Sequence, residues 1–502
     1  MKRFIGILCI AGLLIGLVSC GSGQETPTTP AQTSVSTTAS TAGTTSTQTS
    51  ASEVTTSITT EQSSTEPTTP TEPDVHVKFD EDSIVFSFAA IGDTHTATKG
   101  SLVKDTGEKT SKAFSVLKEW ALKNDEDGLD AVIHVGDLVN SHKKEQIDLF
   151  KKIYSENFDV TKVPLVYCFG DGHDLTWSEN AASSIFDFTS AFGQSYYLYD
   201  VAQEQIAKGN RHCVIDGYHF IALEPVSRSP ITYDAKTKQW LDQTLADITA
   251  ENPDAYVFVL THPMITGTTY GSELGNSWAT SDLTEILSKY PQVIIFGGHL
   301  HYPINDERSI MQTDFTAVGC GAVHYTCVDT EAAGTAANLS DETNQGLLVQ
   351  IDSDGDVRIT RIDFENDMEI KTAWELSAPT ADGSHLTRFT EKRGDENTAP
   401  YFAADATMEV IPGNLKVTVS ASAAKDDDMV HHYILKVTDI ASQTTTKTRQ
   451  EADYYKSSDL SALSETIDFR ITVGEGREYL IELYAYDSWG AVSEPLSMKY
   501  QR

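Results

Sequence analysis

The chain has 502 residues, enough for two or three domains and at least one large hydrophobic core. Its formal net charge of −36 makes the surface repel phosphate backbones, which argues against nucleic acid as a stable partner. Beyond the first 20 residues only Cys168, Cys213, Cys320 and Cys327 remain, too few in so long a chain for a disulfide framework. Cys168 lies in an apolar run and is expected to be a buried thiol, whereas Cys320 and Cys327 are close enough in sequence to pair.

The first 20 residues have the features of an export signal. Lys2 and Arg3 form a short basic region, and residues 4–18 form an apolar run that is too short to span a bilayer comfortably. The run ends in Leu-Val-Ser followed by Cys20, an order that resembles the lipobox of bacterial lipoproteins. The resemblance implies a lipoprotein signal peptide over 1–20 and a lipid on Cys20, which would anchor the protein to the extracellular face of the bacterial cell membrane. The alternative is an ordinary signal peptide with an incidental cysteine.

Residues 21–75 consist almost entirely of Thr, Ser, Pro, Gln, Ala and Glu. A segment with so few large apolar residues cannot offset the entropy lost on ordering. We therefore expect a disordered Thr/Ser/Pro-rich tether that holds the folded part away from the membrane.

From residue 76 to 390 the chain alternates short apolar runs with amphipathic helices. The expected strands are nearly continuous apolar runs, at 84–91, 131–135, 163–169, 256–260 and 293–296. Helical stripes begin at Phe114, Gln239 and Leu283, and an Asp-Gly turn within 346–362 predicts a closing hairpin. Continuous apolarity indicates strands that are covered on both faces, and the alternation with helices predicts a layered α/β domain.

Residues 391–502 carry alternating strands without helices between them, which is typical of a small antiparallel sandwich. The expected strands lie at 415–420, 433–437, 467–471 and 479–486. The last of these, followed by Asp487 and Gly490, resembles the penultimate strand of a fibronectin type III domain, with Tyr479 as its tyrosine corner. The resemblance implies an all-β immunoglobulin/fibronectin III-like sandwich, which is a candidate for contact with cell wall or glycans.

Each of the five apolar runs of the α/β region is followed at once by a turn that carries Asp or His. In chain order the turns are Gly92-Asp93-Thr94-His95, Gly136-Asp137-Leu138-Val139-Asn140, Gly170-Asp171-Gly172-His173-Asp174, Thr261-His262-Pro263 and Gly297-Gly298-His299-Leu300-His301. The carboxyl ends of strands form the ligand-binding edge of an open α/β sheet, so these side chains are expected to converge. Imidazole together with carboxylate suits first-row metals such as Mn, Fe or Zn. One such turn is a weak signal, but five in order predict a metal site.

This ordered series looks like the calcineurin-like metallophosphoesterase superfamily, over about residues 80–370. The resemblance implies a domain over 76–390 built as a β-sandwich of mixed sheets flanked by helices, with a centre of two divalent metal ions (Mn, Fe or Zn). Carried over by position, the first metal would be held by Asp93, His95, Asp137 and His301. Asp137 would bridge to a second metal, shared with His262 and His299.

The third turn carries the expected catalytic residues and departs from the family pattern. By resemblance, His173 would stabilise the transition state or protonate the leaving alkoxide, and Asp174 would orient it. The family usually has Gly-Asn-His-Asp/Glu here, and that Asn binds the second metal and the phosphate. Either Asp171 replaces this Asn as a metal ligand with one Gly inserted, or Gly172 occupies the Asn position and a ligand is lost.

The leading hypothesis is an extracellular, membrane-anchored enzyme that hydrolyses a small phosphomonoester or phosphodiester. Two metals bridged by one carboxylate would hold the phosphate and generate hydroxide for in-line attack. We expect substrate walls from the loop 267–280, which holds Tyr270, Asn276 and Trp278, and from the stretch after His301. The alternative is a catalytically weakened surface binding or adhesion protein that uses the same fold and the sandwich for recognition. The altered third turn favours this alternative, and the intact remaining ligands oppose it.

Overall fold

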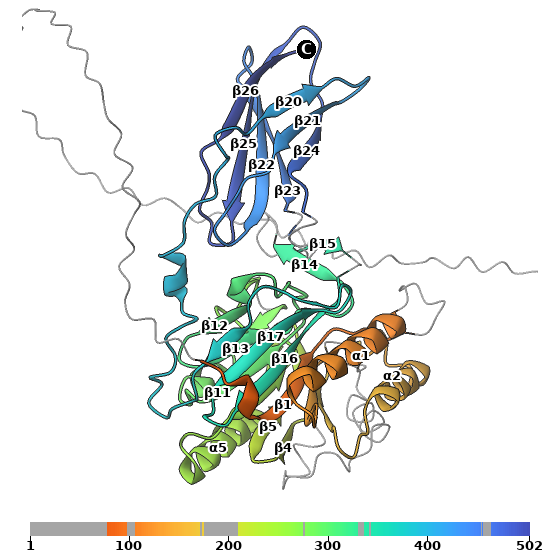
Figure 1. The fold of residues 1–502 in the computed structure, drawn as a ribbon, viewed down its shortest axis with the longest axis vertical. Helices are drawn as coiled ribbons and strands as arrows, with labels where there is room; N and C mark the ends of the chain where they lie inside the picture. The colour runs from red at the N-terminus through yellow and green to blue at the C-terminus, as the bar shows by residue number, and fades with distance from the viewer. Residues whose placement is uncertain are drawn as a thin grey trace, which may run out of the picture. The chain divides into compact units, whose positions relative to one another are not determined.

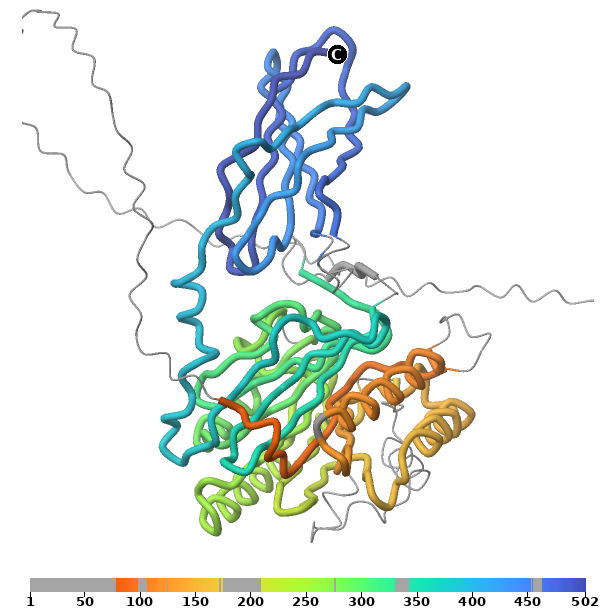
Figure 2. Tube along the Cα trace, viewed as in Figure 1, coloured from red at the N-terminus to blue at the C-terminus, as the bar shows by residue number. Residues whose placement is uncertain are grey.

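The computed structural model describes residues 78–97, 106–170, 173–174, 209–274, 277–329, 336–340, 343–452, 454 and 463–502. The expected signal peptide and tether therefore lie outside the described residues, as do Asp171 and Asn276. The described residues belong to one compact unit. Figures 1 and 2 follow the chain through this unit, from the orange segment of β1 to the blue C-terminal strands.

Two mixed sheets form the α/β part (Figure 1). The first has the order β18-β17-β16-β1-β2-β3, with β19 paired to β17. Its strands are β1 (Ile84–Ile91), β2 (Ala131–Val135), β3 (Leu165–Cys168), β16 (Gln345–Asp352), β17 (Val357–Asp363), β18 (Met368–Glu369) and β19 (Trp374–Leu376). β1 pairs in parallel with β2 and antiparallel with β16, so a strand from late in the chain lies beside the first one.

The second sheet has the order β12-β13-β11-β8-β5-β4. Its strands are β4 (Arg211–Ile215), β5 (Tyr218–Ala222), β8 (Val257–Thr261), β11 (Val293–Gly297), β12 (Ile310–Gln312) and β13 (Thr316–Gly319). The run from β13 to β5 is parallel throughout, which places the ends of β8 and β11 side by side at one edge.

Helices and short elements complete this part. The helices are α1 (Thr106–Asn124), α2 (Lys144–Asn157), α5 (Ala235–Glu251) and α6 (Thr284–Leu287). The short strand pairs are β6 (Ser227–Arg228) with β7 (Ile231–Thr232), β9 (Met264–Ile265) with β10 (Ala279–Thr280), and β14 (Thr326–Asp329) with β15 (Ala336–Ser340). The 3-10 turns are η1 (Glu81–Ser83), η3 (Glu307–Ser309) and η4 (Glu391–Gly394). Among the described residues, no helix has the length and apolar character needed to cross a bilayer.

The helices cover the sheets with the faces that their apolar stripes predict. Phe114 on α1 makes an edge-to-face contact with Phe150 on α2, their ring centroids 5.9 Å apart, and α1 also contacts β1 and β16. On the other sheet, Leu241 and Leu245 of α5 are fully buried and share a hydrophobic cluster with Val259 of β8. The Asp234 side chain accepts a hydrogen bond from the Thr237 N–H at 2.7 Å and so caps the start of α5.

Four phenylalanines join the two sheets. Phe88 on β1 lies with its ring centroid 5.5 Å from that of Phe220 on β5, 4.8 Å from Phe258 on β8 and 5.9 Å from Phe296 on β11. All four side chains are fully buried, and such aromatic pairs add to the stabilisation that burial alone provides. Phe88 therefore sets the separation of the first sheet from three strands of the second.

Most expected elements of the α/β part are confirmed, with shifts at their ends. β1 and β2 have the expected bounds, and the hairpin is formed by β16 and β17, which pair from Gln345 with Asp363 to Ile351 with Val357. The helical stripe that begins at Leu283 was expected to continue to Tyr290, but the helix is shorter, since α6 ends at Leu287. β4 and β5 were missed because each carries polar residues, such as His212 and His219, among its apolar ones.

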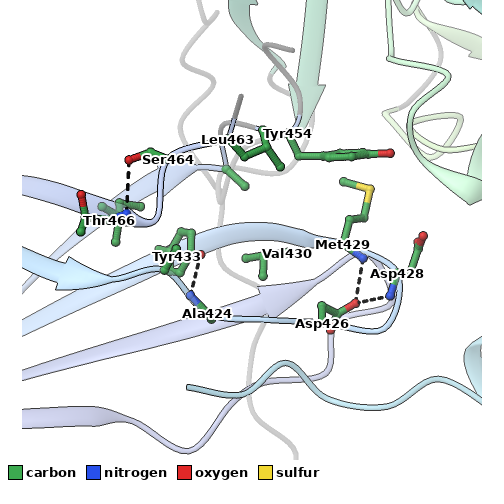
Figure 3. A pocket seen from close by; sticks show the side chains of 13 residues that line it. Ala424, Asp426, Asp428, Met429, Val430, Tyr433, Tyr454, Leu463, Ser464 and Thr466 are labelled. Carbon is green, nitrogen blue, oxygen red and sulfur yellow. Dashed lines mark hydrogen bonds between the residues drawn. The ribbon is translucent and has the colours of Figure 1, made fainter. Parts of the chain in front are cut away.

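The C-terminal part is all-β, as expected. One sheet contains β20 (Met408–Ile411), β21 (Val417–Ser422) and β24 (Thr466–Ile471), and the other contains β22 (Val430–Asp439), β23 (Thr444–Glu451), β25 (Glu478–Asp487) and β26 (Leu496–Gln501). The Tyr479 hydroxyl accepts a hydrogen bond from the Gly474 N–H at 2.8 Å, which is the contact of a tyrosine corner. A cavity of about 230 Å³ opens near Tyr433, Tyr454 and Asp428 (Figure 3).

The four described cysteines are free thiols. Cys168, Cys213 and Cys320 are buried, as expected for Cys168, and Cys327 is partly exposed. The pairing of Cys320 with Cys327 that the sequence allowed is therefore absent from this structure, in which Cys327 lies on β14 and Cys320 follows β13.

We predict that Phe88→Ala lowers the free energy of unfolding by about 3–5 kcal/mol, because it removes a fully buried ring from between the sheets. Val85→Ala on the same strand is the matched control, since Val85 is 55% exposed and the change there is expected to stay within about 0.5 kcal/mol. Urea denaturation followed by circular dichroism measures both. Equal shifts for the two variants would contradict the role assigned to Phe88.

Candidate metal centre

The expected site residues lie where strands of both sheets end. Asp93 and His95 follow β1, and Asp137 follows β2, the parallel neighbour of β1. Backbone hydrogen bonds hold these two turns together: the Asp93 N–H donates to the Gly136 carbonyl at 3.0 Å, and the His95 N–H to the Asp137 carbonyl at 2.9 Å. Backbone hydrogen bonds between the two turns therefore fix the positions of Asp93, His95 and Asp137 independently of side-chain contacts.

The second sheet supplies the other imidazoles. His262 follows β8, and His299 and His301 follow β11, its parallel neighbour. The Gly298 N–H donates to the His262 carbonyl at 2.9 Å, so these turns are also fastened to each other. Each sheet thus presents its own pair of adjacent strand ends to the site.

Asp93, His95 and His301 converge on one point. The Nε2 atom of His301 lies 3.1 Å from Oδ1 of Asp93 and 3.2 Å from Nε2 of His95. All three residues are buried. Their ligand atoms lie within 4.8 Å of one another, which is the spacing of groups that share a metal ion.

Asp137 lies at the centre of the remaining groups. Its Oδ2 atom is 3.5 Å from Nε2 of His262, 3.6 Å from Nε2 of His95 and 4.0 Å from Nε2 of His173. Its Oδ1 atom is buried and has no hydrogen-bond partner among the described residues. A buried carboxylate oxygen without a donor is costly unless a cation satisfies it, so the donor set fits divalent metal ions. Asp137 also belongs to two groups of possible ligands, one with His95 and His173 and one with Asp93 and His262.

The backbone of the site is strained at the residues that point inward. The five that follow β1, β2 and β11 have φ between 42° and 66°, in the left-handed region: Asp93, His95, Asp137, His299 and His301. Non-glycine residues adopt this region at a cost, and the cost is met most often at functional sites. Glycines make room beside them, since a Cβ on Gly136 would lie 2.6 Å from Nδ1 of His262, and a Cβ on Gly170 would collide with the Asp137 carboxylate.

Backbone carbonyls orient the imidazoles. The Val135 carbonyl accepts from Nδ1 of His262 at 2.8 Å, and the Tyr325 carbonyl accepts from Nδ1 of His301 at 3.0 Å. The Ser277 carbonyl accepts from Nε2 of His299 at 2.9 Å, and the Asn140 carbonyl accepts from Nδ1 of His173 at 2.8 Å. A carbonyl can only accept, so the proton sits on the bonded nitrogen and the other nitrogen keeps its lone pair. This is the arrangement of metal-binding histidines, whose second nitrogen bonds to a protein group.

Burial and proximity set the charges of the ligands. Burial raises the pKa of Asp93, but His301 outweighs it and the pKa is lowered to about 2. Burial likewise raises the pKa of Asp137, but the neighbouring His262 and His95 outweigh it and hold that pKa well below the usual value. Burial lowers the pKa of His95 well below 6.5. The carboxylates are therefore ionised and His95 is neutral near pH 7, the forms that bind cations.

Asp174 holds the second turn. Its carboxylate accepts backbone N–H bonds from Leu138 at 3.1 Å, Val139 at 2.9 Å and Gly170 at 2.9 Å. Burial, together with repulsion from Asp137, raises the pKa of Asp174 to about 7. Asp174 was expected to orient His173. In the structure Asp174 binds the backbone of the turns that follow β2 and β3, and the Asn140 carbonyl accepts from the ring of His173.

The structure places the other expected residues as follows. His299 has its Nε2 bonded to Ser277, and its ring stacks on Trp278 with centroids 4.9 Å apart, so Trp278 borders the site as expected of a wall residue. Tyr270 does not: it is buried, and its hydroxyl bonds to Asp329 and His431 instead. The position of Asp171 stays a prediction because this residue lies outside the described part of the chain.

Two residues that lie at the site were not singled out from the sequence. His324 and Tyr325 lie beside the ligands, with the His324 ring centroid 5.2 Å from that of His95 and the Tyr325 centroid 4.1 Å from that of His301. From the sequence, only the stretch after His301 was expected to border the site. The available signal was a histidine five residues after the apolar strand β13, a looser form of the pattern of the five turns.

Comparison with known proteins agrees with this geometry. The family model of calcineurin-like phosphoesterases matches residues 86–303, a range that contains every predicted metal ligand. No curated protein matches the sequence. Among solved structures, the chain is similar to a dimetal phosphatase from Danio rerio, with 11% identity and a TM-score of 0.40, over 59% of this chain and 100% of that one.

Two further structures are similar. A purple acid phosphatase from yellow lupin (Lupinus luteus) shares 15% identity with a TM-score of 0.41, over 60% of this chain and 55% of that one. A fibronectin type III domain of human collagen XX shares 10% identity with a TM-score of 0.16, over 21% of this chain and 94% of that one.

We predict that Asp174→Ala lowers the free energy of unfolding of the metal-free protein by about 3 kcal/mol, because three backbone N–H groups lose their buried acceptor. Asp148→Ala is the control, since the Asp148 side chain is 51% exposed and pairs with Lys144 on the helix surface. Chemical denaturation of both variants measures the difference. A loss for Asp174→Ala no greater than the control's would show that the turn does not depend on Asp174.

Proposed function

We propose that the chain, whose residues 86–303 match the family model of calcineurin-like phosphoesterases, hydrolyses a small phosphomonoester or phosphodiester at the outer face of a bacterial membrane. The observation that carries the proposal is the convergence of Asp93 and Asp137 with four imidazoles, those of His95, His173, His262 and His301, in three overlapping groups of possible metal ligands. No such set is needed for folding, since an apolar core would be cheaper than buried charges.

The donor groups divide naturally between two divalent ions. Asp93, His95 and His301 would hold one ion, and Asp137 with His262 would hold the other. His299, whose ring centroid lies 4.7 Å from that of His262, would complete the second set. Bound there, such ions would polarise the phosphoryl oxygens and lower the pKa of a water molecule for in-line attack. The side chains of this chain would fix the positions of those ions, and the carboxylates of Asp93 and Asp137 are ionised.

His173 is the catalytic histidine of this proposal. Its side chain is 40% exposed, whereas those of His95, His262 and His301 are almost fully buried. Its Nδ1 donates to the Asn140 carbonyl, which leaves Nε2 toward the centre, 4.0 Å from the Asp137 carboxylate. When protonated, His173 would bind the phosphoryl group or give its proton to the leaving alkoxide.

The position on the membrane rests on the N-terminal sequence. Cys20 follows a basic and apolar leader, and the Thr/Ser/Pro-rich residues 21–75 separate it from the described domains. The negative charge of the chain opposes the binding of a small phosphoester less than that of a polyanion. At the membrane, the lipid anchor and not surface charge would hold the protein.

We predict that the purified protein with Mn²⁺ hydrolyses aryl phosphomonoesters, aryl phosphodiesters or both, and that Asp137→Ala lowers kcat/KM at least about 100-fold. That loss exceeds the usual effect of removing a group that only orients a ligand. His142→Ala, an exposed histidine three residues beyond Val139, is the control and is expected to keep its activity. Release of the aryl alcohol is the measurement. No turnover with Mn²⁺, Fe²⁺ or Zn²⁺ would instead favour the surface binding protein.

We also predict that Cys20→Ala moves the protein from the membrane fraction to the soluble fraction when it is expressed in a bacterium, because the lipid attachment site is lost. Cys9→Ala changes a cysteine in the same leader and is expected to leave the protein in the membrane fraction. Fractionation with immunoblotting distinguishes the two. A membrane-bound Cys20→Ala variant would refute the lipid anchor.

A further inference from the structure

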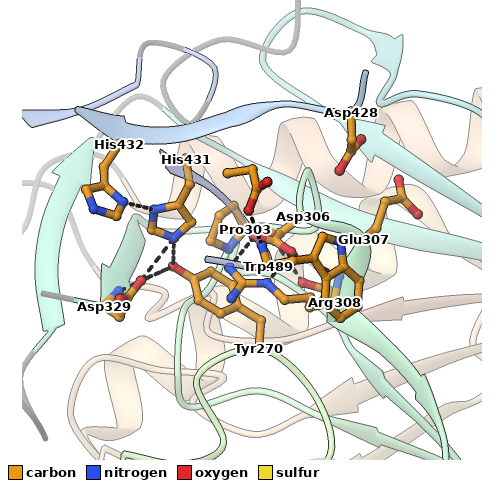
Figure 4. Close-up of polar contacts among 12 residues, drawn as sticks. Tyr270, Pro303, Asp306, Glu307, Arg308, Asp329, Asp428, His431, His432 and Trp489 are labelled. Atoms are coloured by element: carbon orange, nitrogen blue, oxygen red, sulfur yellow. Dashed lines mark hydrogen bonds and ion pairs between the residues drawn. The ribbon is translucent and has the colours of Figure 1, made fainter. Parts of the chain in front are cut away.

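A polar cluster, buried except at Asp329, joins the α/β part to the C-terminal sandwich (Figure 4). The Tyr270 hydroxyl donates to Oδ1 of Asp329 at 2.5 Å and lies 2.7 Å from Nε2 of His431, which is itself 3.0 Å from the same carboxylate oxygen. Tyr270 and His431 are almost fully buried. We call Tyr270, Asp329 and His431 the Tyr270 cluster. Its first two members belong to the α/β part, and His431 is the second residue of strand β22.

One route leads from this cluster to the metal ligand His301 along β14. The Cys327 N–H donates to the His301 carbonyl at 2.8 Å, and the His301 ring donates from Nδ1 to the Tyr325 carbonyl at 3.0 Å. Asp329 is the last residue of the strand that contains Cys327. Cys327 on β14 therefore holds the backbone of His301, and Tyr325, the residue before β14, holds its ring. The far end of β14 is fastened by the Tyr270 cluster.

A second route runs through aromatic packing. The ring of Tyr270 lies 4.5 Å, centroid to centroid, from that of Tyr302, the residue next to His301. Gly271 permits this approach, because a Cβ there would collide with the Tyr302 ring. The guanidinium of Arg308 lies 4.0 Å from the Tyr270 ring centroid, and buried Asp306 binds that guanidinium at 2.7 and 2.9 Å. Tyr270 thus cannot move without displacing Tyr302 or Arg308.

The sandwich holds its end of the contact rigidly. Nδ1 of His431 lies 2.9 Å from Nδ1 of His432, whose ring stacks on Tyr486 with centroids 4.7 Å apart and planes 8° from parallel. β22 lies inside its sheet, paired with β23 and with β25, and Arg449 on β23 donates to the Asp329 carbonyl at 3.1 Å. His431 therefore projects from an interior strand, not from a loose end.

The charges of the cluster favour a fixed arrangement. Burial raises the pKa of Tyr270 well above 10, so the phenol stays protonated and donates to Asp329. Burial also raises the pKa of Asp329, but His431, Tyr270 and Arg449 outweigh it and lower the pKa below its usual value. A carboxylate that is ionised and surrounded by donors on three sides has few alternative positions.

From these two routes we propose that the sandwich is part of the metal centre: His431 and Asp329 act through Tyr270 and β14 as positioning residues for the ligand His301. The inference rests on the proposed function, since it assumes that His301 binds a metal. It makes the C-terminal domain a structural part of the enzyme in addition to any surface that it offers to cell wall or glycans.

The test is Tyr270→Phe, which keeps the ring against Tyr302 and Arg308 but removes the hydroxyl that joins Asp329 to His431. We expect Mn²⁺ to bind the purified full-length protein about 10-fold more weakly, the lower end of the effect of losing a group that orients a metal ligand. We also expect a lower kcat with KM unchanged, and faster amide hydrogen exchange at residues 298–303 in the metal-free protein.

Tyr484→Phe is the matched control. It removes the same atom from the sandwich, where the Tyr484 hydroxyl bonds to Glu482 at 3.3 Å, and it is expected to leave all three measurements unchanged. His431→Gln is a second variant that breaks the cluster from the sandwich side. Its effect and that of Tyr270→Phe are expected to be less than additive in the double variant, because both remove the same bridge.

Two results would overturn the proposal. One is Mn²⁺ affinity for Tyr270→Phe and His431→Gln within twofold of the Tyr484→Phe value. The other is unchanged hydrogen exchange at 298–303 in the metal-free variants. Failure of the proposed function looks different, because the wild-type protein itself would then bind no metal. The exchange measurement still decides the role of the cluster in that case.

Discussion

The site depends on one buried carboxylate. Oδ2 of Asp137 lies within 4.0 Å of three imidazole nitrogens, and Oδ1 is buried without a hydrogen bond among the described residues. An ionised group in such surroundings is stable only if positive charge is close to it. The left-handed backbone at Asp137 and the glycines at 136 and 170 hold this carboxylate in place at a cost to folding, which the three N–H bonds to Asp174 partly offset. Such a cost is expected where a bound cation compensates the buried negative charge of Asp137.

The ligands come from two sheets, and this division decides which contacts control the site. Asp93 and Asp137 belong to the strand ends of the first sheet, and His262 and His301 to those of the second. The distance between Asp137 and His262 is therefore set by the packing between the sheets. Phe88 and the three phenylalanines that it touches hold that packing, which makes an apolar contact in the core part of the geometry of a polar site.

The same dependence extends to the C-terminal sandwich. The backbone of His301 is held by Cys327 on β14 and its ring by Tyr325, the residue before β14, and β14 ends at Asp329 in the Tyr270 cluster. A domain whose sequence shows no chemistry of its own thus contributes a buried histidine to the support of a ligand. Another contact across the same boundary, the ion pair of Lys371 with Asp428, agrees with a fixed interface.

The sequence by itself determined the five turns, their order and the kind of chemistry they carry. A buried strand followed by Asp or His is a local pattern, and it was readable at Asp93, Asp137 and His262 without knowledge of the fold. Only the tertiary structure decided which groups face one another. It assigned Tyr270 to the sandwich contact and not to a substrate wall, gave Asp174 to the backbone of the second turn, and brought His324 and Tyr325 beside the ligands. These outcomes depend on strand pairing and sheet packing between residues far apart in the chain, and a local pattern carries no information on such distances.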